Sequence, residues 1–184
     1  MNYLGVYDDV LSKEECDQII EDYDKVDPCR KSFGSDNSAK KVGTTMFCDM
    51  TENLFKDFNR PVMSALCKGL PQYKEKYSFL CDQSTWKLDK HYNVQRFDDG
   101  GGYFSLHCEQ MYEDTYRMLV FMIYLNDCEC GTEFPYQDTI LEAKVGRLVL
   151  WPAAWTHPHK GVTPNIGRKY IVTGWYKYTD FKKG

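Results

Sequence analysis

The stretch that most constrains the fold is RMLVFMIYL, at residues 117–125. Successive side chains of a β-strand point to opposite faces of its sheet, and residues 118–125 are apolar on both faces. A strand of this kind must be covered on two sides. The stretch therefore predicts a central strand with a second layer packed on it, and helices from the N-terminal part of the chain are the candidate cover.

Further strands are predicted from about residue 75 onward, where short runs rich in aromatic and β-branched residues are separated by Gly, Asp, Asn and Pro. Strands at this spacing are typical of an all-β sandwich or barrel. The remaining candidate strands are residues 91–97, 103–109, 147–151 and 169–176. Together with the helices below, they predict a β-sandwich with helices packed on one side.

Two helices are predicted in the first part of the chain. Residues 11–26 combine one apolar face with a capping box, in which Ser12 is followed three residues later by Glu15. Residues 53–68 also place apolar side chains at helical spacing. Pro61 is expected to break this second helix or to start a new piece, and Gly69 is expected to end it.

Composition narrows the class of protein. The 184 residues fit one domain, and an apolar share of 42% is enough for a core. A net charge of −4 does not favour a broad nucleic-acid-binding surface. The sequence shows neither a signal peptide nor a run apolar enough to span a membrane. We therefore expect a cytoplasmic protein whose eight cysteines are free thiols, with the single CxC pair, Cys128 and Cys130, structural or incidental.

Two short histidine patterns supply candidate metal ligands. His107 and Glu109 are two residues apart in a predicted strand, so that both side chains share one face and can reach one metal ion. His157 and His159 are also two apart. One imidazole from this second pair would complete two histidines and one carboxylate, a set that suits non-haem Fe(II). Each pattern alone is more often a surface histidine than a ligand, and the spacing leaves open which of the two histidines would serve.

The ordered series of motifs resembles the 2-oxoglutarate- and Fe(II)-dependent dioxygenases, in their prolyl 4-hydroxylase-like branch. The similarity runs from LSKEECDQII through RMLVFMIYLND and GTEFPYQD to VGRLVLWP, HPHKG and GRKYIVTGWY, and is weak between residues 27 and 90. It implies a mainly β fold with α-helices: a double-stranded β-helix, or distorted jelly roll, with N-terminal helices packed on one sheet. Residues 1–184 would form a single domain, helical to about residue 75 and with its core at about 76–178.

The resemblance also implies the metal ligands. In this family the distal histidine lies about ten residues before a basic residue that begins the last core strand, and counting back from Lys169 gives His159. The implied set is His107, Glu109 and His159, with His157 either behind the ligands as a supporting residue or at the rim of the site. The family usually has Asp where this chain has Glu109, which we interpret as a tolerated variant because both are oxygen donors.

The cosubstrate site follows from charge and from the resemblance together. The distal carboxylate of 2-oxoglutarate needs a fixed cation in a partly dry pocket. Lys169 and Arg168 are adjacent, so only one can face inward from a strand. Matching the family makes Lys169 the inward cation, with Tyr124 and Thr173 beside it.

A second departure from the family concerns the segment before the metal motif. The family often has a tyrosine where this chain has Phe97, and phenylalanine cannot donate a hydrogen bond. Gln95, on the same strand face, is a candidate substitute. The following GGGY, residues 100–103, predicts a turn at the mouth of the site, with Tyr103 and Trp175 as candidate substrate contacts.

The implied reaction is hydroxylation of an unactivated C–H bond, with Fe(II) as cofactor, 2-oxoglutarate and O2 as cosubstrates, and ascorbate as a further candidate requirement. No catalytic residue beyond the iron site is needed. Peptidyl proline is the leading substrate, and another peptide, a protein or a small molecule stays open as the substrate. The rival interpretations are a jelly-roll binding module without chemistry and a cupin-like metal protein without 2-oxoglutarate turnover. Oligomeric state is not indicated.

Overall fold

The computed structural model describes residues 2–33, 40–82, 85–111, 114–164 and 166–179. Its largest element is a seven-stranded antiparallel sheet in the order β1-β10-β7-β12-β5-β4-β2. From one edge to the other these strands span Gly5–Tyr7, Arg147–Pro152, Arg117–Tyr124, Lys169–Tyr178, Trp86–Phe97, Thr44–Asp49 and Lys31–Phe33. The apolar stretch at 117–125 forms β7, inside the sheet as predicted.

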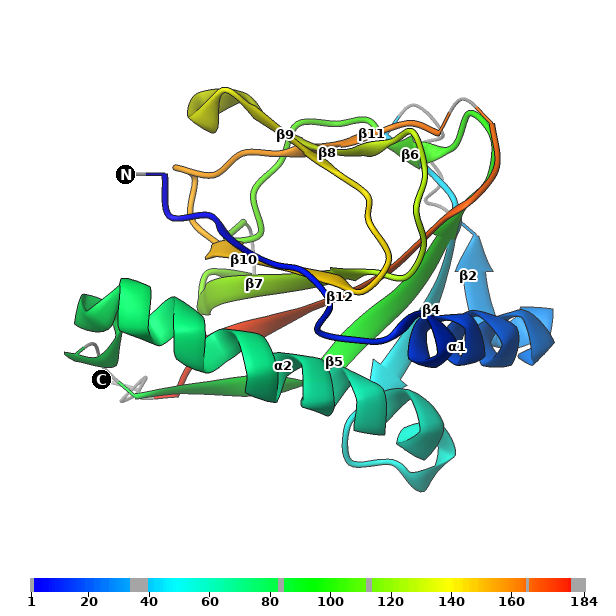
Figure 1. The fold of residues 1–184 in the computed structure, drawn as a ribbon, viewed down its shortest axis with the longest axis horizontal. Coiled ribbons are helices and arrows are strands. Elements are labelled where there is room, and N and C mark those ends of the chain that lie inside the picture. Colours follow the sequence, from blue (N-terminus) through cyan, green and yellow to red (C-terminus); the bar gives the residue numbers. More distant parts are fainter. Residues whose placement is uncertain (1, 34–39, 83–84, 112–113, 165, 180–184) are drawn as a thin grey trace.

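Two smaller sheets lie across from one face of the large sheet, and the helices lie on its other face (Figure 1). The three-stranded sheet pairs β11, Lys160–Val162, with β8, Gly131–Phe134, and β8 with β9, Thr139–Glu142. The two-stranded sheet pairs β3, Lys41–Val42, with β6, Gly102–Tyr103. Short 3-10 turns occupy Pro28–Arg30, Asn53–Phe55, Ser78–Asp82 and Pro135–Gln137.

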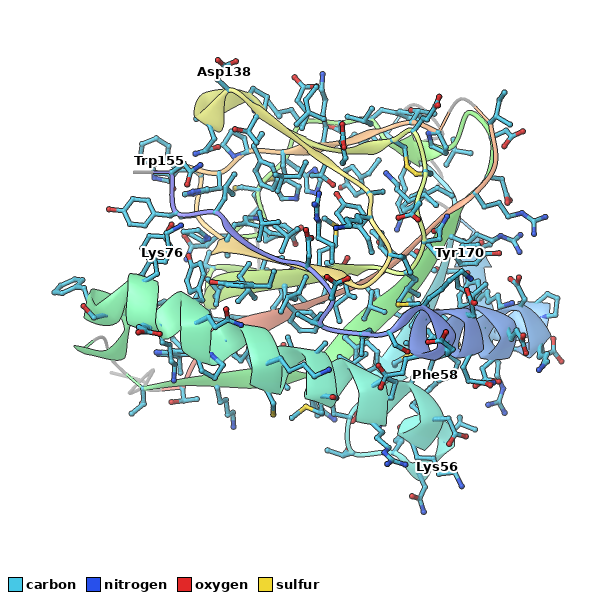
Figure 2. All side chains as sticks on the ribbon, viewed as in Figure 1. Lys56, Phe58, Lys76, Asp138, Trp155 and Tyr170 are labelled. Carbon is cyan, nitrogen blue, oxygen red and sulfur yellow. A yellow bond between two sulfur atoms is a disulfide. The ribbon has the colours of Figure 1, made fainter. Side chains whose placement is uncertain are left out.

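Side chains fill the space on both faces of the large sheet (Figure 2). Alternate residues of β7 enter two different apolar clusters, which explains why this strand has no polar face. Leu119, Phe121 and Ile123 join the cluster that contains residues of the helices. Val120, Met122 and Tyr124 join the cluster between the large and small sheets. The second cluster borders the candidate site described below.

Helix α1 spans Lys13–Lys25 and begins as the sequence predicts. The Ser12 side chain accepts a hydrogen bond from the Glu15 backbone, and the Glu15 side chain accepts one from the Ser12 backbone, so the capping box is confirmed. The helix buries Cys16, Ile19 and Tyr23. No helix within the described ranges combines the length and the apolar character that a membrane crossing needs.

Helix α2 spans Lys56–Lys76 without interruption, so the predicted break at Pro61 and the predicted end at Gly69 are both wrong. A proline removes one ladder hydrogen bond, but the buried face of α2 continues past it and outweighs that local preference. Gly69 lies where α2 crosses β10, and a Cβ at this position would collide with the Leu148 side chain. The glycine therefore permits close packing of the helix and does not end it.

The N-terminal part and residues 103–109 also differ from expectation. The first 49 residues contribute β1, β2 and β4 to the large sheet, in addition to α1. Of the predicted strand 103–109, only Tyr103 lies in a regular strand, Gly102–Tyr103. His107 forms an isolated bridge instead, opposite His159. After Tyr103 this segment no longer pairs continuously with a neighbouring strand, and its His107 and Glu109 side chains lie near His159.

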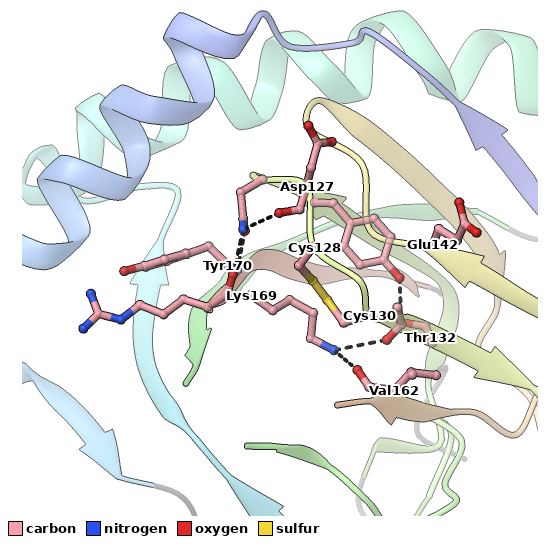
Figure 3. The surroundings of a disulfide bond; sticks show 12 residues. Asp127, Cys128, Cys130, Thr132, Glu142, Val162, Lys169 and Tyr170 are labelled. Atoms are coloured by element: carbon pink, nitrogen blue, oxygen red, sulfur yellow. Dashed lines mark hydrogen bonds between the residues drawn. A yellow bond between two sulfur atoms is a disulfide. The ribbon is translucent and has the colours of Figure 1, made fainter. Parts of the chain in front are cut away.

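Cys128 and Cys130 form a disulfide just before β8 (Figure 3), so the prediction of free thiols is wrong for this pair. Their Cα atoms are 5.2 Å apart, a separation that a disulfide can span. The sequence interpretation considered CxC only as a metal motif and overlooked a bridge within one turn. Five other cysteines are free thiols: Cys16, Cys29, Cys48, Cys67 and Cys108. The side chain of Cys81 lies outside the described residues.

Gly146, in the turn before β10, is expected to be essential for stability. Its φ is +71°, and a Cβ would collide with the Leu11 backbone carbonyl at the start of α1. Gly146→Ala should lower the free energy of unfolding by about 2–5 kcal/mol, through backbone strain plus the clash. Urea denaturation measures this value. Gly167→Ala is the control, because φ there is +90° and, apart from the two neighbouring residues, no atom of the described residues lies within 4 Å of the added Cβ. Equal losses in the two variants would disprove the role of the Leu11 contact.

Candidate active site

Three of the predicted residues converge between the large and small sheets. His107 and His159 lie opposite each other in the isolated bridge, where each backbone N–H donates to the other's carbonyl at 3.1 and 2.8 Å. Glu109 Oε1 is 3.6 Å from His107 Nε2 and 3.5 Å from His159 Nε2. One ligand atom from each residue lies within 4.8 Å of the others. The bridge thus brings the two histidine motifs together although about fifty residues separate them.

Backbone carbonyls orient both imidazoles. Nδ1 of His107 is 2.9 Å from the Ser105 carbonyl, and Nδ1 of His159 is 3.1 Å from the His157 carbonyl. A hydrogen bond from Nδ1–H to a carbonyl leaves Nε2 unprotonated, which is the form that binds a metal. Both Nε2 atoms then face Glu109 as acceptors with free lone pairs.

His157 has a different environment from His159. Its Nε2 is 2.9 Å from the Asn2 carbonyl, and its Nδ1 is 2.9 Å from Thr156 Oγ1. Burial, together with the neighbouring His159, lowers the pKa of His157, against the effect of the Asn2 carbonyl. Because both ring nitrogens are engaged, His157 has no free donor atom for a metal. Its backbone carbonyl instead helps to orient His159.

Glu109 is fixed by contacts to its second oxygen. Oε2 accepts hydrogen bonds from Trp175 Nε1 at 2.9 Å and from Arg117 Nη1 at 3.1 Å. The Arg117 guanidinium also stacks on the Trp175 ring, 3.7 Å from its centroid. Burial raises the pKa of Glu109, but its interactions with the His107 and His159 side chains outweigh that effect and hold the pKa well below its usual range. The carboxylate is thus ionised, with Oε1 facing the two imidazoles.

The donor set fits an iron site. Two neutral imidazoles and one carboxylate on one side, with an open cavity on the other, suit non-haem Fe(II) and leave positions for other ligands. The backbone bends at residue 109, and from there the glutamate side chain brings Oε1 beside both Nε2 atoms. The variant at this position is therefore compatible with a three-residue metal site.

Lys169 lies in a dry part of the same cavity. Only 3% of the residue is exposed, and Nζ donates to the carbonyls of Gly131 and Val162, each at 3.1 Å (Figure 3). An ammonium has three N–H donors, so one is left over. Burial lowers the pKa of Lys169 to about 8. The neighbouring Arg168 is exposed and pairs with Asp98 at 2.9 Å, as expected for the opposite strand face.

Thr173 and Tyr124 differ in how they meet the cavity. Thr173 lines it, and its Oγ1 is buried with no hydrogen-bond partner among the described residues. Tyr124 is fully buried behind Thr132, to whose Oγ1 its hydroxyl is hydrogen-bonded at 2.7 Å. Thr132, which the sequence interpretation missed, reaches the cavity in place of Tyr124. An unpartnered hydroxyl and a buried ammonium in one cavity fit a bound carboxylate.

One cavity of about 400 Å³ connects His107, Glu109 and His159 with Lys169 and Thr173. Besides the three converging residues, Lys169 and Thr173, its lining includes several that the sequence interpretation left without a role, among them Lys41, Phe47, Arg117 and Thr132. Tyr103 and Trp175, predicted as candidate substrate contacts, also line it. Tyr103 stacks on the His107 ring, with 3.9 Å between the two centroids. Phe47 is 65% exposed and marks the open side of the cavity.

Comparison with known families agrees with this geometry. Residues 92–177, which include every predicted site residue, match the model of the 2OG-Fe(II) oxygenase superfamily. Residues 92–177 belong to that superfamily. The chain is accordingly an oxidoreductase of the 2-oxoglutarate-dependent dioxygenase class, and membership implies Fe(II), 2-oxoglutarate and O2. No curated protein matches the chain by sequence.

Solved structures show that the oxygenase shares the fold of prolyl hydroxylases. The viral collagen prolyl hydroxylase of Paramecium Bursaria Chlorella virus-1, in its 2OG complex, superposes with a TM-score of 0.69 at 17% identity, over 96% of this chain and 97% of that one. A Pseudomonas putida prolyl-4-hydroxylase gives 0.66 at 15%, over 98% and 95%. A Trichoplax adhaerens prolyl hydroxylase in complex with a hypoxia-inducible-factor peptide gives 0.71 at 16%, over 96% and 84%.

Proposed function

We propose that the protein hydroxylates a C–H bond of a peptidyl proline, using Fe(II), 2-oxoglutarate and O2. The observation that carries the proposal is the convergence of His107, Glu109 and His159 in one cavity with the buried ammonium of Lys169. In the balanced reaction, 2-oxoglutarate, O2 and the substrate C–H group give succinate, CO2 and the hydroxylated product. The bound iron supplies the oxidation chemistry.

The residues of this chain hold and orient the reactants. In the proposed arrangement His107, Glu109 and His159 bind Fe(II), while Trp175 and Arg117 keep the Glu109 carboxylate in position. Lys169 donates its remaining N–H to the distal carboxylate of 2-oxoglutarate. The Thr173 hydroxyl donates a hydrogen bond to the same carboxylate. Tyr124 does not contact this carboxylate directly and acts through its hydrogen bond to Thr132. The apolar walls exclude water, which strengthens each of these interactions.

We further infer that the large sheet and the two small sheets form a double-stranded β-helix and that residues 1–184 form a single domain. Support comes from the strand order of the large sheet and from the small sheets, which lie across from one of its faces (Figure 1). It also comes from the prolyl hydroxylase structures, which superpose over nearly the whole chain. The helical N-terminal part and the core are then one folding unit, since β1, β2 and β4 belong to the same sheet as β7.

Peptidyl proline is proposed because of the names of the structures with the same fold. One acts on collagen by its name, and another is in complex with a peptide fragment. The open side of the cavity, bordered by the exposed Phe47 ring, also gives an extended chain a route to the metal ligands. A small-molecule substrate is the alternative at the same site. A cytoplasmic location stays a prediction, and the Cys128–Cys130 disulfide is an observation against it.

Succinate release from 2-oxoglutarate tests the proposed function. The protein is incubated with Fe(II), ascorbate and O2, with and without proline-containing peptides, and the peptides are analysed by mass spectrometry. We expect peptide-dependent succinate and a mass gain of one oxygen on proline. Succinate without peptide hydroxylation would favour the small-molecule alternative. No succinate under any condition, from protein that binds metal, would contradict the dioxygenase assignment.

Trp175→Phe is expected to weaken metal binding by about 10-fold, because the loss of a group that orients a metal ligand costs about 10–100-fold and Arg117 continues to hold Glu109. Titration with Mn(II) measures the affinity. Trp86→Phe is the matched control, since the Trp86 indole donates to the Leu80 carbonyl, away from the cavity lining. Unchanged Mn(II) affinity in Trp175→Phe would show that Arg117 alone orients the carboxylate.

A further inference from the structure

We propose that Lys41 is a second carboxylate-binding residue of the cavity, placed on the side of the metal ligands. This inference rests on the proposed function, because it concerns the same cavity. It adds a role for a residue of β3, a strand outside the segment that matches the oxygenase superfamily. The carboxylate has two candidate sources: the keto-acid end of 2-oxoglutarate, or an acidic group on the substrate.

The strand register places Lys41 beside the metal ligands. Lys41 pairs with Tyr103 across the β3–β6 ladder, and the Tyr103 ring stacks on His107. The Lys41 ammonium is 6.0 Å from the centroid of the Tyr103 ring. A single aromatic ring thus separates this cation from one of the three converging side chains.

The Lys41 ammonium has room for an anionic partner. Its hydrogen bond among the described residues goes to Thr45 Oγ1 at 2.8 Å, and no described carboxylate lies within ion-pair distance of it. The side chain is half-buried, and this desolvation lowers its pKa to about 8, against the opposing effect of Glu109. A cation taken partly out of water without a counter-ion is unfavourable. A bound carboxylate would remove this cost.

The charges of the whole cavity point the same way. Its described lining contains three cations, Lys41, Lys169 and Arg117, and one acid, Glu109. Arg117 is already paired with Glu109 and Asp114, each at 3.1 Å. A divalent metal would offset the charge of Glu109 further. The two lysines therefore remain as cations without acidic partners in the described lining, which favours binding of two carboxylates or of one dicarboxylate.

Both lysines lie near the ring of Phe97 but have different partners. The Lys41 ammonium is 5.9 Å and the Lys169 ammonium 5.3 Å from the centroid of its ring. Lys169 donates to backbone carbonyls at the dry end, whereas Lys41 lies next to the ring that stacks on a metal-site histidine. A phenylalanine cannot donate a hydrogen bond, whereas the Lys41 ammonium beside this ring can.

Calorimetric titration of the Zn(II)-loaded protein tests the first source. The ligands are 2-oxoglutarate and 2-oxobutyrate, which keeps the keto acid and lacks the distal carboxylate. If Lys41 binds the keto-acid end, Lys41→Gln should weaken both ligands by about 10- to 100-fold, the worth of a charge-assisted hydrogen bond. Lys169→Gln should weaken 2-oxoglutarate alone. Lys40→Gln is the matched control, because Lys40 is the exposed neighbour on the same segment.

A second measurement tests the substrate source. Acetate is titrated into protein saturated with Zn(II) and 2-oxoglutarate, and the NMR signal of ¹³C-methylated Lys41 is followed. The signal is assigned by its loss in Lys41→Arg, which keeps the positive charge. A saturable shift of this signal, absent for Lys40, would identify Lys41 as a site for a substrate carboxylate. This arm measures binding in the wild-type sequence, so it remains decisive even where Lys41→Gln is unstable.

The outcomes separate this inference from the proposed function. Weaker binding of both keto acids in Lys41→Gln supports the cosubstrate source, and an acetate shift alone supports the substrate source. The inference is overturned if the wild-type protein binds 2-oxoglutarate, Lys41→Gln binds both keto acids as tightly as the wild type, and acetate does not shift the Lys41 signal. The proposed function is then unaffected. A wild-type protein that does not bind 2-oxoglutarate contradicts the proposed function, and acetate titration with Zn(II) alone then decides the role of Lys41.

Discussion

His159→Ala is expected to reduce metal affinity by more than about 100-fold. Changing a group that merely supports a metal ligand costs about 10–100-fold, and removal of a ligand should cost more. The proposed ligand atom is Nε2, which faces Glu109 while Nδ1 contacts the His157 carbonyl. Calorimetric titration with Mn(II) measures the affinity, and succinate release from 2-oxoglutarate should fall with it.

His157→Ala is the control for that prediction. The backbone carbonyl that orients His159 is retained in this variant, so Mn(II) affinity should stay within about 10-fold of the wild-type value. The variant should instead be less stable, because it leaves the Asn2 carbonyl and the Thr156 hydroxyl without their partners. Thermal unfolding measures this loss. If His157→Ala abolishes Mn(II) binding and His159→Ala spares it, the roles of the two histidines are reversed.

The fold was predictable where the signal is local. The capping box at Ser12 and Glu15 needs only one helical turn, and the two-sided apolar pattern of β7 needs only one strand. β1 and β4 were not predictable, because they pair with strands distant in sequence: Gly5 of β1, for example, pairs with Leu150, and Thr44 of β4 pairs with Arg96. Gly69 was misinterpreted for the same reason, since its role depends on Leu148 of another element.

The site shows the same division between local and distant information. Spacing identified His107 and Glu109 as a pair. The alternation of strand side chains, together with the resemblance to the family, placed Lys169 inside and Arg168 outside. No spacing rule could link Lys41 to Tyr103, since they meet through two strands of only two residues each. Thr132 was missed because the interposition of its hydroxyl in front of Tyr124 depends on how β8 packs over β7.

Lys169→Ala is expected to raise the apparent Michaelis constant for 2-oxoglutarate by about 100-fold or more. Removing one partner of a buried ion pair costs roughly 3–5 kcal/mol when the other charge stays buried, and about 1.4 kcal/mol corresponds to a factor of ten. Metal affinity should stay close to the wild-type value, because the three proposed ligands do not contact Lys169. Initial rates of succinate release across 2-oxoglutarate concentrations, with Mn(II) titration alongside, separate the two effects.

Arg168→Ala and pH dependence provide the controls. Arg168 is exposed and pairs with Asp98 on the other strand face, so Arg168→Ala should change the Michaelis constant little.

The ammonium form of Lys169 binds the carboxylate, and its pKa in the free protein is about 8. Affinity for 2-oxoglutarate should therefore be constant below pH 8 and fall up to about tenfold per pH unit above it, until the raised pKa of the complex is reached. Lys169→Ala should lose the part of this dependence that Lys169 contributes, while Lys41 in the same cavity, whose pKa is also about 8, would keep its own contribution. A damaging Arg168→Ala with a silent Lys169→Ala would mean that the cosubstrate contacts the opposite face of β12.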